Sequence, residues 1–369
     1  MTDTEKNKRK LINYGGEGCI FIPQLPCDKK TKPTKKSKRK TKRKTKRKTK
    51  LLFRNIPSNE GKISNMIMKR SRNYSEWCLL WDSNCMSEDY KHLKKISEVE
   101  KCFLKKNRKV PNDKSKFKLL QGDYVGITST DYYKEIFNKN IIKNFNKFKT
   151  AFYKMIHSMR SLFMGLIELQ KIGICHNDIK VDNIIYNDKS LYYIDFGLAF
   201  TFRNSKSVIS RMKKEFNSGR IYESYPFEYI YYPKLTKEEI DREITDISYG
   251  DKRMNYIFAE YIHERLFNRN MNNIRIQILK DKLNDKNKPE LEPLVKKLDV
   301  YSLGMFPLMI LIEACDNNDI DINTVIRILK LKEFKETIDL LRDMTKQDYR
   351  DRISAQEACE RYLNLIKEI

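Results

Sequence analysis

Two polar clusters separated by one short hairpin constrain this chain more than any other feature. The first, His176–Asn183 (HNDIKVDN), is followed by the β-favouring segments Asn183–Tyr186 and Leu191–Ile194, with turn-forming residues between them. An antiparallel hairpin returns the chain to its starting point. Asp195, which lies 17 positions after Asp178, is therefore predicted to lie close to it.

The residue types in these clusters are the ones that phosphoryl transfer requires. A carboxylate accepts or orients the proton of an attacking hydroxyl, and an ammonium neutralises the transferring group. A carboxamide and a second carboxylate hold Mg²⁺ against nucleotide phosphates. Asp-Phe-Gly alone is an ordinary strand exit and His-x-Asp alone an ordinary polar loop. Seven such identities in order arise by chance only about 10⁻⁹ times per starting position, at ordinary residue usage.

In this order and spacing the clusters resemble the eukaryotic-type protein kinase family. The resemblance implies that Asp178 is the catalytic base and that Lys180 contacts the γ-phosphate, with His176 as a further catalytic residue of the same loop. It implies that Asn183 and Asp195 are Mg²⁺ ligands. A lysine two positions after the aspartate is typical of the Ser/Thr kinases.

Further landmarks extend the resemblance along the chain. Glu228, in Tyr-Pro-Phe-Glu, resembles the end of the activation segment, and Arg352 the arginine that pairs with that glutamate. Asp299 begins an apolar segment that resembles the central helix, where the aspartate braces the catalytic loop. Asn177 departs from the family because it replaces an arginine that meets a phosphorylated activation segment, which puts that mode of regulation in question.

The N-terminal turn resembles the glycine-rich loop that covers ATP. Asn13 replaces the first glycine, and Gly15, Gly16, Gly18 and Ile20 follow. Glycines let the backbone approach the phosphates closely; a plain hairpin is the alternative interpretation. The segment Gly18–Pro23 (GCIFIP) resembles the corresponding segment in protein kinases of large DNA viruses.

The nucleotide-anchoring lysine has no obvious position. A short strand is predicted over Ile63–Met68, where alignment with the viral form places an asparagine instead. Lys69 is taken as the nucleotide contact, with Glu88 or Asp89 as its helix partner. The alternatives are Lys62, Asn65 or a lysine of the basic insert. Without such a lysine the chain would be a pseudokinase with little transfer.

A basic insert interrupts the N-terminal region. Residues 29–50 contain 15 Lys and Arg among 22 positions and no acid, against a net charge of +26 for the whole chain. With nothing apolar to bury, the segment 27–50 is predicted to be disordered. It is interpreted as a binding site for nucleic acid or another polyanion, as a nuclear-import signal, or as a solvated loop.

The cysteines and the apolar segments bear on location. Eight cysteines show no C-x-x-C pair, which argues against a disulfide scaffold and for a reducing compartment. The chain shows no N-terminal apolar signal, and Leu303–Ile312 is too short to cross a bilayer. The prediction is an intracellular protein of the cytoplasm or nucleus, or of the virion if viral, with no transmembrane segment.

Helical periodicity dominates the later part of the chain. An amphipathic helix is predicted over Phe148–Gln170, stopped by Gly173. A buried helix is predicted over Leu298–Ala314, kinked at Pro307. Mixed helical spacing covers Tyr74–Ile96.

Together these features predict an α+β protein with a bilobal protein-kinase-like fold. A small β-rich N-lobe covers 11–124 and a larger helical C-lobe covers 125–369, with a hinge near Leu119–Tyr124 and an insert at about 230–297. The predicted activity is Mg²⁺-dependent transfer of the ATP γ-phosphate to Ser/Thr hydroxyls of protein substrates. The alternatives are a pseudokinase scaffold and a nucleic-acid-binding protein that acts through the basic insert.

Overall fold

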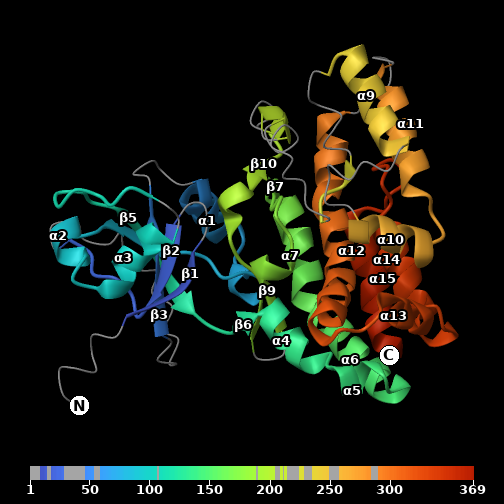
Figure 1. Cartoon of the computed structure of the whole chain (residues 1–369), viewed down its shortest axis with the longest axis horizontal. Coiled ribbons are helices and arrows are strands. Elements are labelled where there is room, and N and C mark those ends of the chain that lie inside the picture. Colours follow the sequence, from blue (N-terminus) through green and yellow to red (C-terminus); the bar gives the residue numbers. More distant parts are fainter. Residues whose placement is uncertain are drawn as a thin grey trace. The chain divides into compact units, whose positions relative to one another are not determined.

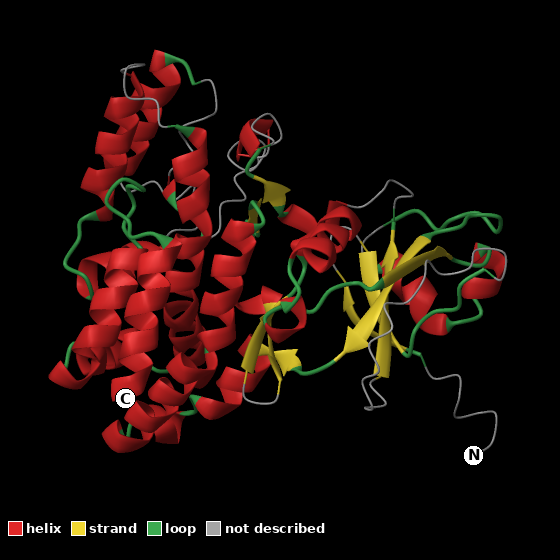
Figure 2. Ribbon diagram, turned by 180° about the vertical axis from the view of Figure 1, so that it is seen from behind, coloured by secondary structure: helices red, strands yellow, loops and turns green. Residues whose placement is uncertain are grey.

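The structure is a computed structural model that divides into two compact units. Unit 1 comprises residues 1–72 and 79–126, and unit 2 comprises 73–78 and 127–369. The structure describes residues 9–14, 18–28, 46–53, 59–105, 108–187, 190–203, 208–210, 212–213, 224–227, 235–248, 257–283 and 290–369. The chain is a mixed α+β protein, with an antiparallel sheet on its N-terminal side and a helical C-terminal part (Figures 1 and 2).

Unit 1 is built on a five-stranded antiparallel sheet with the strand order β1-β2-β3-β5-β4. Its strands are β1 (Lys10–Tyr14), β2 (Gly18–Ile22), β3 (Lys46–Leu52), β4 (Ser83–Met86) and β5 (Lys118–Tyr124). Its helices are α1 (Asn59–Arg70), α2 (Tyr90–Leu93) and α3 (Ser97–Leu104). The segment predicted as a hinge is thus part of β5, and the division between the units follows Gly126.

The two faces of this sheet bury different residues, as the period of two along a strand requires. Leu51 of β3 and Leu119 of β5 belong to the larger core, which also contains residues of α2 and α3. Leu52 and Leu120 point to the other face, where they pack with Trp81. Alternation along β3 and β5 therefore decides which side chains meet on each face.

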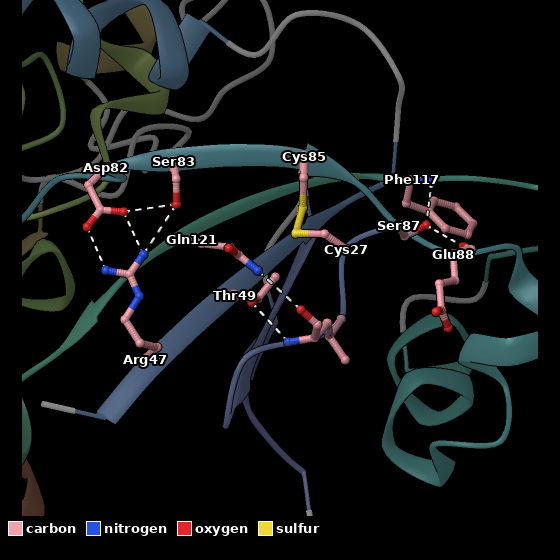
Figure 3. Close-up of a disulfide and its surroundings, with 11 residues drawn as sticks. Cys27, Arg47, Thr49, Asp82, Ser83, Cys85, Ser87, Glu88, Phe117 and Gln121 are labelled. Atoms are coloured by element: carbon pink, nitrogen blue, oxygen red, sulfur yellow. Dashed lines mark hydrogen bonds and ion pairs between the residues drawn. A yellow bond between two sulfur atoms is a disulfide. The ribbon is translucent and has the colours of Figure 1, made fainter. Parts of the chain in front are cut away.

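Two disulfides cross-link unit 1, and the prediction from the cysteine spacing was wrong. Cys19 of β2 is bonded to Cys102 of α3, and Cys27 is bonded to Cys85 of β4 (Figure 3). The partners are 83 and 58 positions apart in the sequence. Only the folded sheet brings them together, so spacing along the chain could not reveal the pairs. The argument for a reducing compartment loses its basis.

The basic insert is shorter than predicted, because its last five residues belong to β3. Arg47 there donates to both carboxylate oxygens of Asp82, at 2.6 Å each, and Figure 3 shows this fork. The Thr49 hydroxyl accepts a hydrogen bond from the Leu25 amide at 3.0 Å. These side chains find partners that a disordered segment would lack. Residues 29–45 lie outside the described residues.

Residues 63–68, predicted as a strand, are helical and lie within α1. Ile63 and Ile67, one turn apart, are both buried, and so is Glu60 one turn before Ile63. This spacing is typical of an amphipathic helix. The predicted helical spacing of Tyr74–Ile96 was also largely wrong, since that segment contains β4 and only short helical turns.

Unit 2 consists of helices with three short strand pairings. Its strands are β6 (Ile127–Thr128), β7 (Ile174–Cys175), β8 (Ile184–Asn187), β9 (Ser190–Tyr193) and β10 (Phe200–Thr201). Its longer helices are α4 (Ser129–Ile136), α6 (Phe145–Ser158), α7 (Arg160–Lys171), α9 (Lys237–Ser248), α10 (Ile257–Arg265), α11 (Met271–Leu283), α12 (Leu291–Asn318), α13 (Ile322–Leu329), α14 (Lys335–Met344) and α15 (Ala355–Glu368). The short helix α5 covers Lys139–Ile142.

The predicted helix over residues 148–170 is present as two helices. α6 ends after Ser158 and α7 begins at Arg160, with Met159 between them. The apolar face is buried as predicted, and Gly173 follows α7 with a φ of 73°. Glycine adopts this left-handed conformation without the steric cost that other residues incur.

α12 is the central buried element of unit 2. It is longer than the predicted helix, contains Pro307, and continues as a helix on both sides of it. Its length and apolar composition would suffice to cross a membrane, but 89% of its most apolar window is buried inside the protein. That burial is the environment of a core helix, as the sequence predicted.

Part of the long insert packs onto the rest of unit 2. α10 contacts α12, and α11 contacts both α9 and α10, as Figure 1 also shows for α9 and α11. His263 of α10 and Arg275 of α11 are buried. This part of the segment 230–297 is therefore integrated into the core of unit 2.

Candidate active site

Two strand pairs in unit 2 bring the predicted polar clusters together. β8 pairs with β9 in the predicted hairpin, with Ile184 opposite Tyr193. β7 pairs with β10, with Cys175 opposite Phe200. The loop before β8 and the loop after β9 are thus held together at both ends. The hairpin prediction is confirmed.

Hydrogen bonds connect these two loops directly. The Ile194 amide donates to the Asn183 carbonyl at 3.0 Å, and His176 Nε2 lies 3.0 Å from the Ile194 carbonyl. The Asn177 side-chain amide donates to the Leu198 carbonyl at 3.4 Å. His176 is fully buried, and desolvation lowers its pKa. Its ring therefore links the loops inside the protein and presents nothing to a substrate.

Asp299 of α12 supports the first loop from beneath. Its carboxylate accepts the backbone amides of His176 at 2.6 Å and Asn177 at 2.9 Å. Burial raises the pKa of Asp299, while the two amides and the nearby His176 act in the opposite direction. The role of a brace, implied by the resemblance for this aspartate, is confirmed.

Both loops contain a residue in the left-handed backbone region. Asn177 has a φ of 61° and Asp195 has a φ of 57°. Asn and Asp enter this region more readily than most residues do. Strained backbone of this kind costs energy and is concentrated at functional sites. The asparagine that replaces the family arginine is therefore suited to the local backbone.

Asp178 is the most highly coordinated side chain of the site. Its Oδ1 lies 3.2 Å from the Lys180 ammonium and accepts the Tyr225 hydroxyl at 3.1 Å. Its Oδ2 accepts the Asn183 side-chain amide at 2.6 Å. The Asp178 side chain is 8% exposed, and burial raises the pKa of its carboxyl, although Lys180 acts in the opposite direction.

Asp195 lies close enough to Asp178 for its charge to raise the pKa of the Asp178 carboxyl further. Its own Oδ1 accepts the Gly197 amide at 3.2 Å. The structure thus assembles four of the predicted groups in one part of unit 2: two carboxylates, an ammonium and a carboxamide. Such an arrangement can orient a hydroxyl donor and neutralise an anion.

Unit 1 contains a separate buried ion pair whose lysine belongs to the basic insert, one of the alternatives left open for the nucleotide-anchoring lysine. Lys50 of β3 lies 2.7 Å from Glu60 of α1, and the two side chains are 8% and 2% exposed. The other Glu60 oxygen accepts the Trp81 indole N–H at 2.5 Å. A buried pair of charges is stable only where geometry and further hydrogen bonds satisfy both partners.

The prediction of Lys69 as the nucleotide-anchoring lysine, with Glu88 or Asp89 as its partner, does not fit this structure. Lys69 is exposed in the last turn of α1. Lys62 and Asn65, two of the alternatives, are exposed on the same helix. Because this segment is helical, none of these side chains is part of the sheet. The buried lysine of the sheet that faces a glutamate of a helix is Lys50.

The register of the sheet places part of the glycine-rich turn beside Lys50. Asn13 lies opposite Ile20, and Ile20 lies opposite Lys50. Gly18 packs so closely on β3 that a Cβ there would lie 2.0 Å from the Leu51 carbonyl oxygen. Gly18 is thus required for the close approach of β2 and β3. Gly15 and Gly16 lie outside the described residues.

Arg352 is buried, and its predicted partner Glu228 lies outside the described residues. The Arg352 guanidinium donates to the backbone carbonyls of Lys297, Lys346 and Gln347. Its charge also lies 5.2 Å from the centre of the Tyr301 ring. These contacts give Arg352 a structural role in unit 2.

Tyr225 was not identified as a site residue from the sequence, and Lys50 was included only as one unspecified lysine of the basic insert. Lys50 directly precedes the apolar run Leu51–Phe53, a signal that the basic segment ends in a buried strand. Tyr225 offers no such signal, because it lies 47 positions after Asp178. Only the folded chain brings its hydroxyl to that carboxylate.

Over the part of the chain that the structure describes, no group of three or more His, Cys, Asp or Glu residues is placed to hold a metal ion. Asn183 and Asp195 are the predicted residues whose side-chain oxygens could hold a Mg²⁺ ion. The Asn183 amide nitrogen makes both of its bonds to Asp178, so its carbonyl oxygen is the atom suited to a cation. Mg²⁺ typically takes few protein ligands and completes its shell with water and substrate phosphates.

Comparison with known proteins adds no family assignment. No protein-family model matches the chain, and no curated protein matches it significantly.

Proposed function

We propose that this chain is a protein kinase that transfers the γ-phosphate of ATP to Ser or Thr hydroxyls of proteins. The observation that carries the proposal is the environment of Asp178. This buried carboxylate contacts Lys180 and Asn183 and lies within electrostatic reach of Asp195. Phosphoryl transfer depends mainly on positioning and charge neutralisation, and these groups provide both.

In this proposal each polar group has a distinct role. Asp178 orients the acceptor hydroxyl and receives its proton. Lys180, at 3.2 Å from Asp178, places a positive charge where the transferring phosphoryl develops negative charge. Both roles are filled by side chains that already contact each other, Asp178 and Lys180.

Asn183 and Asp195 would hold Mg²⁺ through oxygen atoms. A Mg²⁺ held by these two residues would supply positive charge that offsets the negative charge of the nucleotide phosphates. The loop contacts described above hold both residues: the Ile194 amide donates to the Asn183 backbone carbonyl, and the Gly197 amide donates to the Asp195 side-chain Oδ1. Their side chains are thus preorganised before any ligand binds.

Unit 1 supplies a second line of support. A sheet lysine paired with a helix glutamate is one of the recurring parts of protein kinases, and Lys50 and Glu60 form such a pair at 2.7 Å. We infer that Lys50 contacts the phosphates of the nucleotide and that Glu60 positions Lys50. The mixed composition of the chain, a five-stranded sheet in unit 1 and helices in unit 2, is compatible with the bilobal kinase fold that we also propose.

The pseudokinase alternative rested on the absence of a suitable lysine. In this proposal Lys50, paired with Glu60, fills that role. The interpretation of the basic insert as a nucleic-acid site concerns mainly residues 29–45, which lie outside the described residues, since residues 46–50 belong to β3.

The proposal is tested by phosphate incorporation from radiolabelled ATP into casein and into myelin basic protein, with purified full-length protein and Mg²⁺. We expect Asp178→Asn to lower incorporation by about 100-fold or more, the typical contribution of a positioned general base. Lys50→Met should lower it strongly as well. The matched control is Lys69→Met, which removes an exposed lysine and should leave incorporation unchanged.

Acid hydrolysis of the labelled product should yield phosphoserine or phosphothreonine. Equal incorporation by Asp178→Asn and by the parent would overturn the proposal, and so would a folded parent that incorporates no label. A urea unfolding curve for each variant separates loss of activity from loss of fold.

A further inference from the structure

We propose that Tyr225 is a positioning residue for Asp178 and fixes the carboxylate in the orientation that the acceptor hydroxyl requires. This inference rests on the proposed function, since it gives Asp178 the role of base. It adds to the site a residue that neither the motif nor the resemblance assigns.

The contact is a direct hydrogen bond between buried groups. The Tyr225 hydroxyl donates to Asp178 Oδ1 at 3.1 Å, and the two residues are 1% and 5% exposed. The Lys180 ammonium lies 3.2 Å from the same oxygen. Hydrogen bonds to charged groups are stronger than those between neutral groups, so this contact has an appreciable effect on the carboxylate.

Together the three donors determine how the carboxylate is rotated. Tyr225 and Lys180 contact Oδ1, while the Asn183 amide contacts Oδ2 at 2.6 Å. Each carboxylate oxygen has two acceptor sites. Oδ1 is therefore occupied, and among the described residues only Asn183 donates to Oδ2. The second acceptor site of Oδ2 is where a substrate hydroxyl can bind.

The backbone on both sides of Tyr225 is held firmly. The Ser302 hydroxyl donates to the Ser224 carbonyl at 2.6 Å. The Phe227 amide donates to Gln347 Oε1 at 3.2 Å. A residue fixed on both sides is suited to supporting a neighbour, whereas a residue that blocks the site and then moves away would need freedom that these bonds remove.

A single turn of α12 supports both halves of the contact. Asp299 holds the backbone before Asp178, and Ser302 holds the backbone before Tyr225. Residues three apart in a helix lie on the same face. The distance between the Tyr225 hydroxyl and Asp178 is therefore set by one rigid buried element, which is the condition for precise positioning.

The test compares Tyr225→Phe with Tyr362→Phe in the full-length protein. Each substitution removes one buried hydroxyl that donates a hydrogen bond, in the control to the Ile156 carbonyl at 2.8 Å. We expect Tyr225→Phe to lower kcat about tenfold, the scale of one lost hydrogen bond to a charged group. The KM for ATP should stay within about twofold, because the phenol contacts the base. Tyr362→Phe should retain the parental kcat.

The outcomes separate this inference from the proposed function. A parent that transfers phosphate, with a Tyr225→Phe variant of equal kcat, overturns the inference and leaves the function standing. A variant more active than the parent also overturns it, because Tyr225 would then obstruct the base. Equal loss of kcat in both variants would show a merely structural effect and overturn it as well. An inactive folded parent overturns both.

Discussion

The two units of this protein stabilise their interiors in different ways. All four cysteines of unit 1 are joined in two disulfides. The four cysteines of unit 2 are buried free thiols, at positions 78, 175, 315 and 359. Unit 1 also contains the buried pair of Lys50 and Glu60, whereas the buried carboxylate Asp299 of unit 2 is satisfied by backbone amides.

This difference follows from the size of the two cores. A small unit buries a smaller fraction of its surface and gains less from the hydrophobic effect, so cross-links add a larger share of its stability. Unit 2 surrounds the long buried helix α12 and needs no such links. The two units should therefore respond differently to reduction, to substitution and to pH.

The chain offers a built-in probe of each unit. It contains two tryptophans, Trp81 in unit 1 and Trp77 in unit 2, and both are largely buried. Fluorescence of a Trp77→Phe variant reports on unit 1, and that of a Trp81→Phe variant reports on unit 2.

The largest expected effect is that of breaking the disulfides. The closed loops span 83 and 58 positions, and the chain-entropy description assigns about 4 kcal/mol of unfolding free energy to each. Replacing Cys19 and Cys102 by Ala should therefore lower the urea midpoint of the Trp81 signal markedly. Dithiothreitol should act on the parent in the same direction.

The Trp77 signal is the control for this prediction, because unit 2 contains no disulfide among its described residues. It should not move on reduction. An unchanged Trp81 midpoint in the double variant would contradict the stabilising role assigned to the cross-link.

The second effect concerns the buried ion pair. Lys50→Met should lower the free energy of unfolding of unit 1 by about 3 kcal/mol, because it leaves the Glu60 charge buried with Trp81 as a remaining donor. Adding Glu60→Leu should restore part of the loss. The measurement is the urea transition of the Trp81 signal.

Lys69→Met provides the comparison for Lys50→Met. Lys69 is exposed on α1, so its loss should change the unfolding free energy by less than about 0.5 kcal/mol. Equal effects of the two substitutions on the unfolding free energy would show that the ion pair of Lys50 and Glu60 does not stabilise unit 1.

The smallest effect is a pH dependence confined to unit 2. Burial raises the pKa of Glu313, on α12, from 4.5 to about 7, and the charge of Asp182 adds to this. A raised pKa means that the folded unit favours the protonated carboxyl. The stability that the protonated Glu313 carboxyl contributes to unit 2 is fully present below about pH 4.5. It is lost as the pH rises through 7.

Glu313→Gln removes this titration. Between pH 5 and pH 8 the urea midpoint of the Trp77 signal should fall more in the parent than in the variant. Parallel pH profiles of parent and variant would refute the assignment to Glu313.

The sequence alone determined the local features of this protein. The hairpin over β8 and β9, the buried helix α12 and the turn at Gly173 follow from alternation, apolar runs and glycine, which act over a few residues. The order and spacing of Asp178, Lys180, Asn183 and Asp195 also lie within one short segment. Their assembly could be predicted because a hairpin links the two clusters.

Tertiary structure decided the rest. The disulfide partners lie far apart in the sequence, and Tyr225 reaches Asp178 across 47 positions. Lys50 belongs to a basic segment that was predicted from its composition to be disordered. Its burial depends on strand pairing with β2 and β5 and on Glu60, a partner in a segment whose helical state was not recognised. Contacts of this kind depend on packing between distant segments, for which the local pattern of a sequence carries no signal.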